Sequence, residues 1–226
     1  MKKKGILLIR VVVAMLVFSI SSSVLSELWA LVLMKSSWSE DTVLLLFQVG
    51  SKAITILIAF PLYVLTMRLF GKMKRFCWNG SKKLMLTEHL KYFSLVFLPV
   101  IVLYGIMIVL MKNGMVPPNA LESITSLRQV IYILIFGCIL MPFIEEIMFR
   151  GFMYGTLEKE GTLFAVIVSS VCFALGHNNP VNIIIGLADG VVFALLVHKT
   201  GGIKYGYIYH VILNIVGSIL IPLIIQ

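Results

Sequence analysis

The sequence is poor in charge. Only 13% of its 226 residues are charged, whereas 60% are hydrophobic and the mean hydropathy is +1.03. A soluble domain is about half apolar and a quarter charged. The scarcity of charge therefore excludes an ordinary soluble protein and is typical of a polytopic membrane protein. The sequence also lacks internal repeats, low-complexity tracts and a separate polar domain.

Acidic residues are scarcer than basic ones, 10 against 19, which gives a formal net charge of +9. The basic residues lie mainly in the intervals between apolar runs, where the positive-inside rule places them in membrane proteins. We therefore expect the lipid bilayer, and no nucleic acid, as a partner. The expected location is the plasma membrane, with several spans and a cytoplasmic N-terminus.

Several chemical markers are missing as well. The three cysteines, Cys77, Cys138 and Cys172, have no paired spacing, which argues against a disulfide framework or a Cys-based metal site. The metalloprotease pattern His-Glu-x-x-His is absent. So is the Gly-x-Ser-x-Gly elbow of serine hydrolases.

Seven apolar runs are present, and most are long enough to cross a bilayer as helices. They predict an all-α, polytopic helical membrane protein of about seven transmembrane helices, forming one integral-membrane domain over residues 1–226. Long apolar runs exclude the alternating pattern of a membrane barrel. We expect the first run to be retained as a helix rather than cleaved. The runs cover approximately residues 11–34, 43–67, 92–111, 130–157, 162–176, 181–197 and 203–225.

Two minor expectations concern the first 129 residues. Glu27 and Lys52 lie at similar depth in the first two spans, counted from the loop that joins them, so we expect a structural ion pair. His89 lies in the basic 68–91 stretch, where we expect it to be solvated.

Two adjacent carboxylates and a guanidinium occur in the fourth apolar run, as Glu145, Glu146 and Arg150. Ionisable groups are costly inside a membrane, and such a cluster indicates a functional site. On a helix Glu146 and Arg150 are four residues apart and share a face, so they can pair. Glu145 is turned away by roughly 100°. The alternative is a purely structural ion pair that joins two helices.

Further polar residues lie in the last three runs, as His177, Asp189, His210 and Asn214. From the turn near residue 158, Glu145 and His177 are each about 20 Å along their helices, so they can meet inside a core ~30 Å thick. His210 and Asn214 are four apart and face the same way. The site is therefore expected between the C-terminal four helices. For Asp189 we favour a structural role.

This set of residues fits amide hydrolysis without a covalent intermediate. A carboxylate beside an imidazole can activate water, and a second imidazole with a carboxamide can stabilise an oxyanion. No cofactor is favoured. The alternative is a divalent metal, such as zinc, held by Glu145, His177 and His210.

Three ordered blocks resemble the CAAX protease and bacteriocin-processing family of intramembrane proteases, which includes type II CAAX prenyl endopeptidases. They are Glu145-Glu146-Ile147-Met148-Phe149-Arg150-Gly151, Phe173-Ala174-Leu175-Gly176-His177 and His210-Val211-Ile212-Leu213-Asn214. The resemblance covers roughly residues 130–217 and makes residues 130–226 the expected catalytic core, following N-terminal helices in residues 1–129.

The resemblance implies an intramembrane endopeptidase in which Glu145 and His177 activate water and His210 and Asn214 form the oxyanion site. Glu146 and Arg150 would support that site. It also implies access from the cytoplasmic side and a membrane-associated peptide or protein as substrate. Asp189 departs from the apolar residue usual at its place in the family. The alternative function is a non-catalytic immunity or sensor-partner protein of the same family.

The charge pattern generates a topology prediction. The 68–91 stretch should be cytoplasmic and the 112–129 stretch external, because basic residues concentrate in the former. A single cysteine near residue 80, in a variant without native cysteines, should stay unlabelled by an impermeant reagent added to intact cells. Labelling from outside would reverse the orientation.

Overall fold

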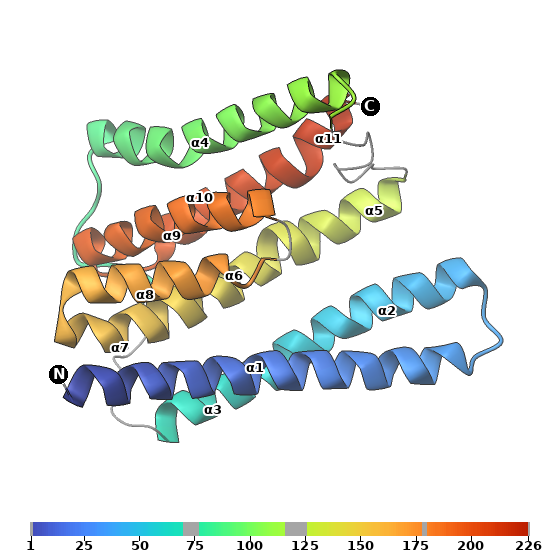
Figure 1. Ribbon diagram of the computed structural model, residues 1–226, viewed down its shortest axis with the longest axis horizontal. Helices are drawn as coiled ribbons and strands as arrows, with labels where there is room; N and C mark the ends of the chain where they lie inside the picture. Colours follow the sequence, from blue (N-terminus) through green and yellow to red (C-terminus); the bar gives the residue numbers. More distant parts are fainter. Residues whose placement is uncertain (1, 70–76, 116–125, 178–179, 226) are drawn as a thin grey trace. The chain divides into compact units, whose positions relative to one another are not determined.

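The computed structural model describes residues 2–69, 77–115, 126–177 and 180–225. In this described part every regular element is a helix and no strand is formed, which confirms the all-α prediction. The chain divides into two compact units, Met1–Met73 and Lys74–Gln226, whose helices are shown in Figure 1. The third predicted span therefore packs with the C-terminal helices. That the whole chain acts as one domain stays a prediction.

Six helices are long and apolar enough to cross a membrane, and a seventh apolar helix is shorter. This agrees with about seven predicted spans, of which the fifth was expected to be short. The long helices are Lys4–Met34, Glu40–Leu69, Leu86–Leu110, Leu127–Glu160, Pro180–Thr200 and Lys204–Ile224, and the short one is Thr162–Ala174.

The first unit is a pair of antiparallel helices. Its elements are α1 (Lys2–Met34), α2 (Glu40–Ile54), a π-helical turn (Thr55–Ala59) and α3 (Phe60–Leu69). Trp29 Nε1 donates a hydrogen bond of 2.9 Å to the Leu46 carbonyl, and the Ser22 and Thr55 hydroxyls are 2.8 Å apart. Such polar contacts commonly join membrane helices.

The predicted Glu27–Lys52 pair is wrong. In the described part of this unit no ion pair joins the two residues, and Glu27 is exposed. Equal depth along two helices does not fix how each helix is rotated about its axis. The side chains that meet across this interface are the uncharged ones of Ser22 and Thr55.

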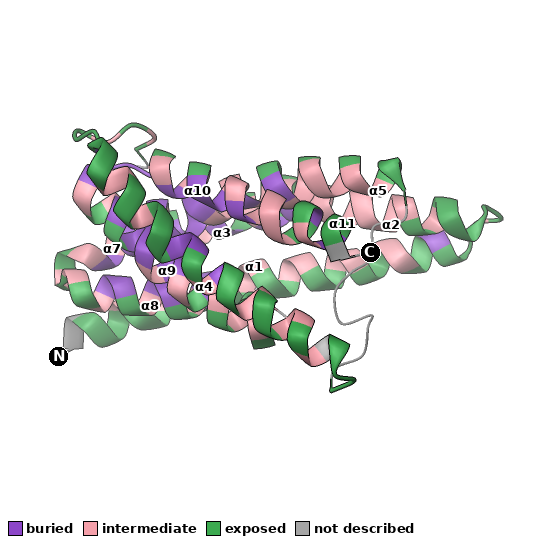
Figure 2. Cartoon of the chain, turned by 90° about the horizontal axis from the view of Figure 1, so that it is seen from above, coloured by how far each residue is buried: buried purple, intermediate pink, exposed green. Residues whose placement is uncertain are grey.

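The second unit contains the remaining helices. They are α4 (Leu86–Lys112), the long helix built from α5 (Leu127–Tyr132), α6 (Met141–Glu145) and α7 (Gly155–Leu157), then α8 (Thr162–Ala174), α9 (Pro180–Thr200), α10 (Lys204–Ile215) and α11 (Ile221–Ile225). Two π-helical segments, Ile133–Leu140 and Glu146–Tyr154, lie on either side of α6. Buried residues concentrate in this unit, notably on α9 and around the short α8 (Figure 2).

Several loop predictions lie partly outside the described residues. Residues 70–76 of the basic stretch, residues 116–125 of the expected external loop, and Asn178 and Asn179 belong to this group. Several helices begin earlier than their apolar runs, as α4 does at Leu86 rather than near Tyr92.

One end of the second unit is polar. Lys199 on α9 pairs with Glu88 on α4, and His198 Nδ1 lies 3.1 Å from Glu158 Oε1. The beginning of α4, the turn after α7 and the end of α9 therefore lie together. All three segments are expected on the cytoplasmic side. In a chain whose helices cross a membrane in alternating directions, they must lie at the same end.

His89 is packed rather than solvated, which corrects the expectation from sequence. Its Nδ1 lies 2.8 Å from the Tyr209 hydroxyl, and its ring contacts Tyr205 with centroids 5.1 Å apart. The first turn of α4 is helical, so His89 lies on the α4 face that contacts α10. Nothing in the local sequence signals these partners, which are about 120 residues away.

A short extended segment at residues 77–84 crosses the turn between α9 and α10. The Ile203 and Lys204 amides donate to the Cys77 and Trp78 carbonyls at 3.1 and 3.2 Å. A side chain at Gly80 would collide with the Thr200 backbone. The exposed Lys83 is therefore a better position than residue 80 for the labelling experiment.

Close packing of α8 on α9 depends on a glycine. A Cβ on Gly190 would lie 2.9 Å from the Cα and Cβ of Ser170, whereas a Cβ on Gly105 of α4 would meet nothing within 4 Å. Small residues let membrane helices approach in this way.

We predict that Gly190→Ala lowers the thermal unfolding temperature of the purified protein, because α8 and α9 must separate. Gly105→Ala is the matched control and should be neutral or stabilising by up to about 1 kcal/mol, the helix-propensity gain of Ala over Gly. If Gly190→Ala is as stable as the control, the close contact between α8 and α9 does not contribute to stability.

Candidate active site

The centre of the second unit contains a buried ion pair. Arg150 Nη1 lies 3.4 Å from Glu146 Oε1, and neither side chain is exposed. The sequence predicted this pair from the four-residue spacing, and the structure confirms it even though the segment from Glu146 onward is π-helical. Removing either partner would leave a buried charge without compensation, which is strongly destabilising.

Aromatic rings surround the guanidinium of Arg150. Its central carbon lies 4.1 Å from the centroid of Phe173 and 5.3 Å from that of Phe193. No guanidinium nitrogen has a well-oriented hydrogen bond to a described residue. The charge is therefore stabilised by Glu146 and by the ring faces, and a desolvated cation over a ring gains about 2 kcal/mol or more.

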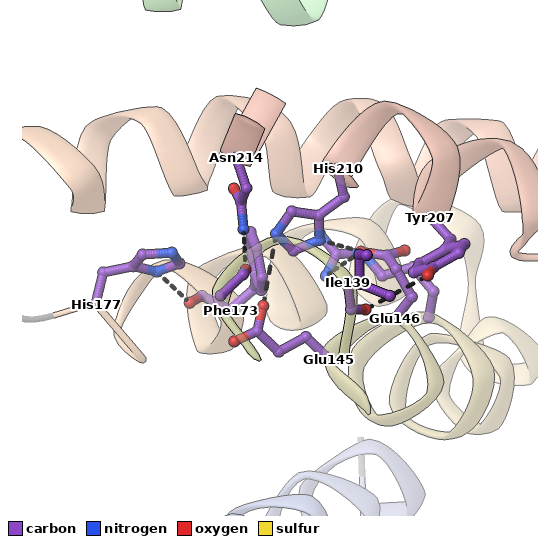
Figure 3. Close-up of polar contacts among 10 residues, drawn as sticks. Ile139, Glu145, Glu146, Phe173, His177, Tyr207, His210 and Asn214 are labelled. Atoms are coloured by element: carbon purple, nitrogen blue, oxygen red, sulfur yellow. Dashed lines mark hydrogen bonds and ion pairs between the residues drawn. The ribbon is translucent and has the colours of Figure 1, made fainter. Parts of the chain in front are cut away.

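His210 connects the ion pair to the second glutamate. Its Nδ1 lies 3.3 Å from Glu146 Oε1, and its Nε2 lies 3.5 Å from Glu145 Oε2. Both contacts are drawn in Figure 3. Because a carboxylate only accepts, the hydrogen bond to Glu146 requires a proton on Nδ1. The imidazole is thus held between two carboxylates that are adjacent in sequence.

The two glutamates differ in environment. The Glu145 side chain is 27% exposed, whereas that of Glu146 is fully buried. The sequence predicted that Glu145 would point elsewhere than Glu146. Both reach the same ring because an imidazole has nitrogens on two edges. Only Glu145 is accessible to water or to another molecule.

Gly206 makes room for Glu146. A Cβ at this position on α10 would lie 2.9 Å from Glu146 Oε2. The carboxylate therefore lies directly against the backbone of α10, one turn before His210. This glycine was not identified from sequence, where nothing distinguishes it from other helical glycines.

His177 contacts neither Glu145 nor His210 directly. Its Nδ1 lies 3.1 Å from the Phe173 carbonyl, which can only accept, so this nitrogen carries the proton. The ring of Phe173 packs against both imidazoles, with centroids 5.1 Å from His177 and 5.5 Å from His210. Phe173 therefore lies between the two histidines.

Asn214 is tied to the neighbouring helix. Its Nδ2 donates a hydrogen bond of 2.9 Å to the Gly137 carbonyl. One turn before His210, the Tyr207 hydroxyl donates to the Ile139 carbonyl at 3.4 Å. Both bonds go to the π-helical segment that precedes α6, where backbone carbonyls can accept extra hydrogen bonds. They join α10 to the helix that carries the glutamates.

A cavity of about 180 Å³ adjoins these residues. His177, Asp189, His210 and Asn214 line it, together with Asn182 and Ser218, while Glu145 does not. Asp189 is 6% exposed, and its Oδ1 has no hydrogen-bond partner among the described residues. The sequence favoured a structural role for Asp189, and that role stays a prediction; the structure places the residue at the cavity, within electrostatic range of Arg150 and His210.

The alternative zinc site was expected at Glu145, His177 and His210. Within the described residues, no three His, Cys, Asp or Glu side chains come together as a metal-binding group. The ring of Phe173 lies between the two histidines, so the structure does not assemble this ligand set. Metal independence itself stays a prediction.

The structure thus brings Glu145, Glu146, Arg150 and His210 into direct contact. His177 joins this group through the ring of Phe173, and both His177 and Asn214 share a cavity with His210. The roles proposed for all six residues stay predictions, because geometry alone does not test catalysis.

The two charged positions should respond differently to substitution. We predict that Arg150→Ala lowers both folded yield and thermal stability, because loss of one partner in a buried pair costs roughly 3–5 kcal/mol in soluble examples. Glu145→Gln is the comparison and should stay near wild-type stability, since Glu145 is partly exposed. Equal thermal shifts of the two variants in detergent would contradict this division.

Comparison with known proteins finds a family similarity in the C-terminal part of the chain. The model of a family described as type II CAAX prenyl endopeptidase Rce1-like matches residues 127–216. The match covers less than half of the chain and includes all three sequence blocks. No solved structure matches significantly.

Two curated bacterial proteins are similar over longer or overlapping parts. The putative membrane peptidase YdiL of Bacillus subtilis (strain 168) is 31% identical over 97 residues, which are 42% of this chain and 40% of that protein. The membrane-embedded CAAX protease MroQ of Staphylococcus aureus (strain USA300) is 28% identical over 140 residues, 59% of this chain and 57% of that protein. The matched part is therefore less than two thirds of either relative. Residues 127–216 are therefore similar to the type II CAAX prenyl endopeptidase Rce1-like family.

Proposed function

We propose that the protein is an intramembrane endopeptidase that hydrolyses a peptide bond of a membrane-associated peptide or protein. The observation that carries this proposal is the contact between Glu145 and His210. A partly exposed carboxylate lies 3.5 Å from an imidazole whose other nitrogen is fixed by a buried ion pair. The similarity of residues 127–216 to the Rce1-like family supports the same function.

Glu145 acts as the general base. It is the accessible carboxylate of the adjacent pair, and a carboxylate beside an imidazole can take a proton from water as the water attacks a carbonyl. The proton then passes from Glu145 to the leaving amine, so no covalent enzyme intermediate is needed. His177 helps hold the water, since its Nδ1 is occupied by Phe173 and its Nε2 is left as an acceptor.

His210 and Asn214 stabilise the oxyanion. For this role we assign a proton to each nitrogen of His210, so that Nδ1–H donates to Glu146 and Nε2–H lies against Glu145 at 3.5 Å. The group of Glu145, Glu146, Arg150 and His210 then has no net charge. When Glu145 takes the proton from water, the Nε2–H is released to the developing oxyanion. Asn214 uses one N–H for Gly137 and keeps a second for the same purpose.

Glu146 and Arg150 act as positioning residues. They are fully buried and fix the Nδ1 edge of His210, so they do not contact the reacting bond. This division assigns chemistry to the exposed member of the glutamate pair and support to the buried one.

We predict that Glu145→Gln reduces cleavage by about 10²–10⁴-fold, the usual contribution of a general base. Peptide termini in membranes should be compared by mass spectrometry between cells producing wild-type and variant protein. Glu160→Gln is the matched control, because it makes the same change outside the cluster. If Glu145→Gln, His177→Ala and His210→Ala all fold and keep full cellular activity, the protein acts as a non-catalytic binder instead.

We predict that hydrolysis survives removal of metal ions. The nucleophile in this mechanism is made by proton transfer to Glu145, whereas a zinc enzyme needs the ion to lower the pKa of its water. Purified protein should cleave its substrate after exhaustive chelation, with elemental analysis showing no stoichiometric ion. If chelation abolishes cleavage and one equivalent of zinc restores it, the mechanism is overturned.

A further inference from the structure

The cavity beside the glutamates has an unusual set of polar groups. Asp189 lines it, is almost fully buried, and forms neither a hydrogen bond nor an ion pair with any described residue. Ionisable residues inside membrane helices normally pair with a neighbour or serve a pathway or substrate. Asp189 lies within electrostatic range of His210 and Arg150 but does not bond to either. Arg150 and His210 are both already in contact with the Glu146 carboxylate.

Two other polar groups of the cavity, His177 and Asn214, each keep a free hydrogen-bond acceptor. His177 uses its Nδ1–H for the Phe173 carbonyl, which leaves Nε2 as an acceptor. Asn214 uses Nδ2 for the Gly137 carbonyl, which leaves its carbonyl oxygen and one N–H. No lysine or arginine lines this cavity among the described residues. The site therefore offers the Asp189 carboxylate and neutral acceptors, while His210, which also lines it, is already engaged by the two glutamates.

The cavity is also reachable and of useful size. Asn182 and Ser218 line it and are exposed, while Asp189 and His210 at its inner part are buried. On α9 Asn182, Gly186 and Asp189 follow at intervals of four and three residues, so they lie on one helix face. Gly186 matters here, because a Cβ would lie 3.1 Å from the His177 ring. The cavity volume of about 180 Å³ leaves room for several waters.

We propose that this cavity binds a basic side chain of the substrate peptide, and that Asp189 is the residue that selects it. The inference rests on the proposed endopeptidase function and adds the substrate class to it. A lysine ammonium or arginine guanidinium supplies hydrogen-bond donors and a positive charge for the unpaired carboxylate of Asp189. His210 lines the same cavity, so the basic residue lies within a few residues of the bond to be cleaved.

Cleavage preference tests this assignment directly. Purified full-length protein in phosphatidylglycerol vesicles is given a library of N-acetylated peptides, and the cleaved bonds are read by mass spectrometry. Wild-type protein should cleave peptides with Lys or Arg at one fixed position near the bond. A lysine peptide should exceed its norleucine counterpart by at least ~10-fold in kcat/KM, because sites built for polar groups discriminate strongly.

Variants at Asp189 separate charge from structure. Asp189→Asn should abolish the lysine preference, so that the ratio of kcat/KM for the lysine and norleucine peptides falls to about one, and Asp189→Glu should retain the preference. Asp41→Asn, at an exposed position of α2, is the matched control. Two results would overturn the assignment: cleavage that depends on Glu145 but shows no preference for a basic residue, and an unchanged preference in Asp189→Asn. Either result leaves the proposed function intact.

A small cation provides a test independent of catalysis and of the variants. n-Butylammonium, which has the shape of a lysine side chain, should raise the thermal unfolding temperature of wild-type protein, whereas n-butanol at the same concentration should not. If wild-type protein cleaves no peptide, the endopeptidase function fails, and this pair of probes still decides whether the cavity binds a cation. Equal effects of the two probes overturn the proposed site.

Discussion

The buried guanidinium of Arg150 is the constraint on which the site depends. A charge in the middle of apolar helices requires compensation, and Glu146 provides it at 3.4 Å. The compensated Glu146 in turn fixes the Nδ1 edge of His210, which directs the Nε2 edge toward Glu145. Glu145 and His210 are therefore positioned by the residues that make the buried charge tolerable.

Such a site requires helices that approach one another closely. Gly206 lets the Glu146 carboxylate lie against α10, and Gly190 brings α9 against Ser170 of α8. The rings of Phe173 and Phe193 then fill the remaining space over Arg150. Without a strong hydrophobic drive between membrane helices, packing and polar contacts of this kind supply most of their association.

Sequence reasoning succeeded where the information is local. Apolar runs predicted the helices, and a four-residue spacing predicted the Glu146–Arg150 pair. It failed where the answer depends on how helices rotate and pack, as for Glu27 and Lys52 or for His89 with Tyr209. The two-sided contact of His210 also needed the tertiary structure. The cytoplasmic access that the resemblance implied stays a prediction.

The three sequence blocks share a physical logic, because each joins residues four apart on a helix. In the first block the spacing pairs Glu146 with Arg150. In the second it lets the imidazole of His177 donate to the carbonyl of Phe173. In the third it places His210 and Asn214 on the α10 face that contacts the glutamate helix. Phe173 links the blocks, since its ring contacts Arg150 and both histidines while its carbonyl fixes one of them. A change at Phe173 therefore alters the ion pair and both imidazoles together, which a role in simple core packing would not require.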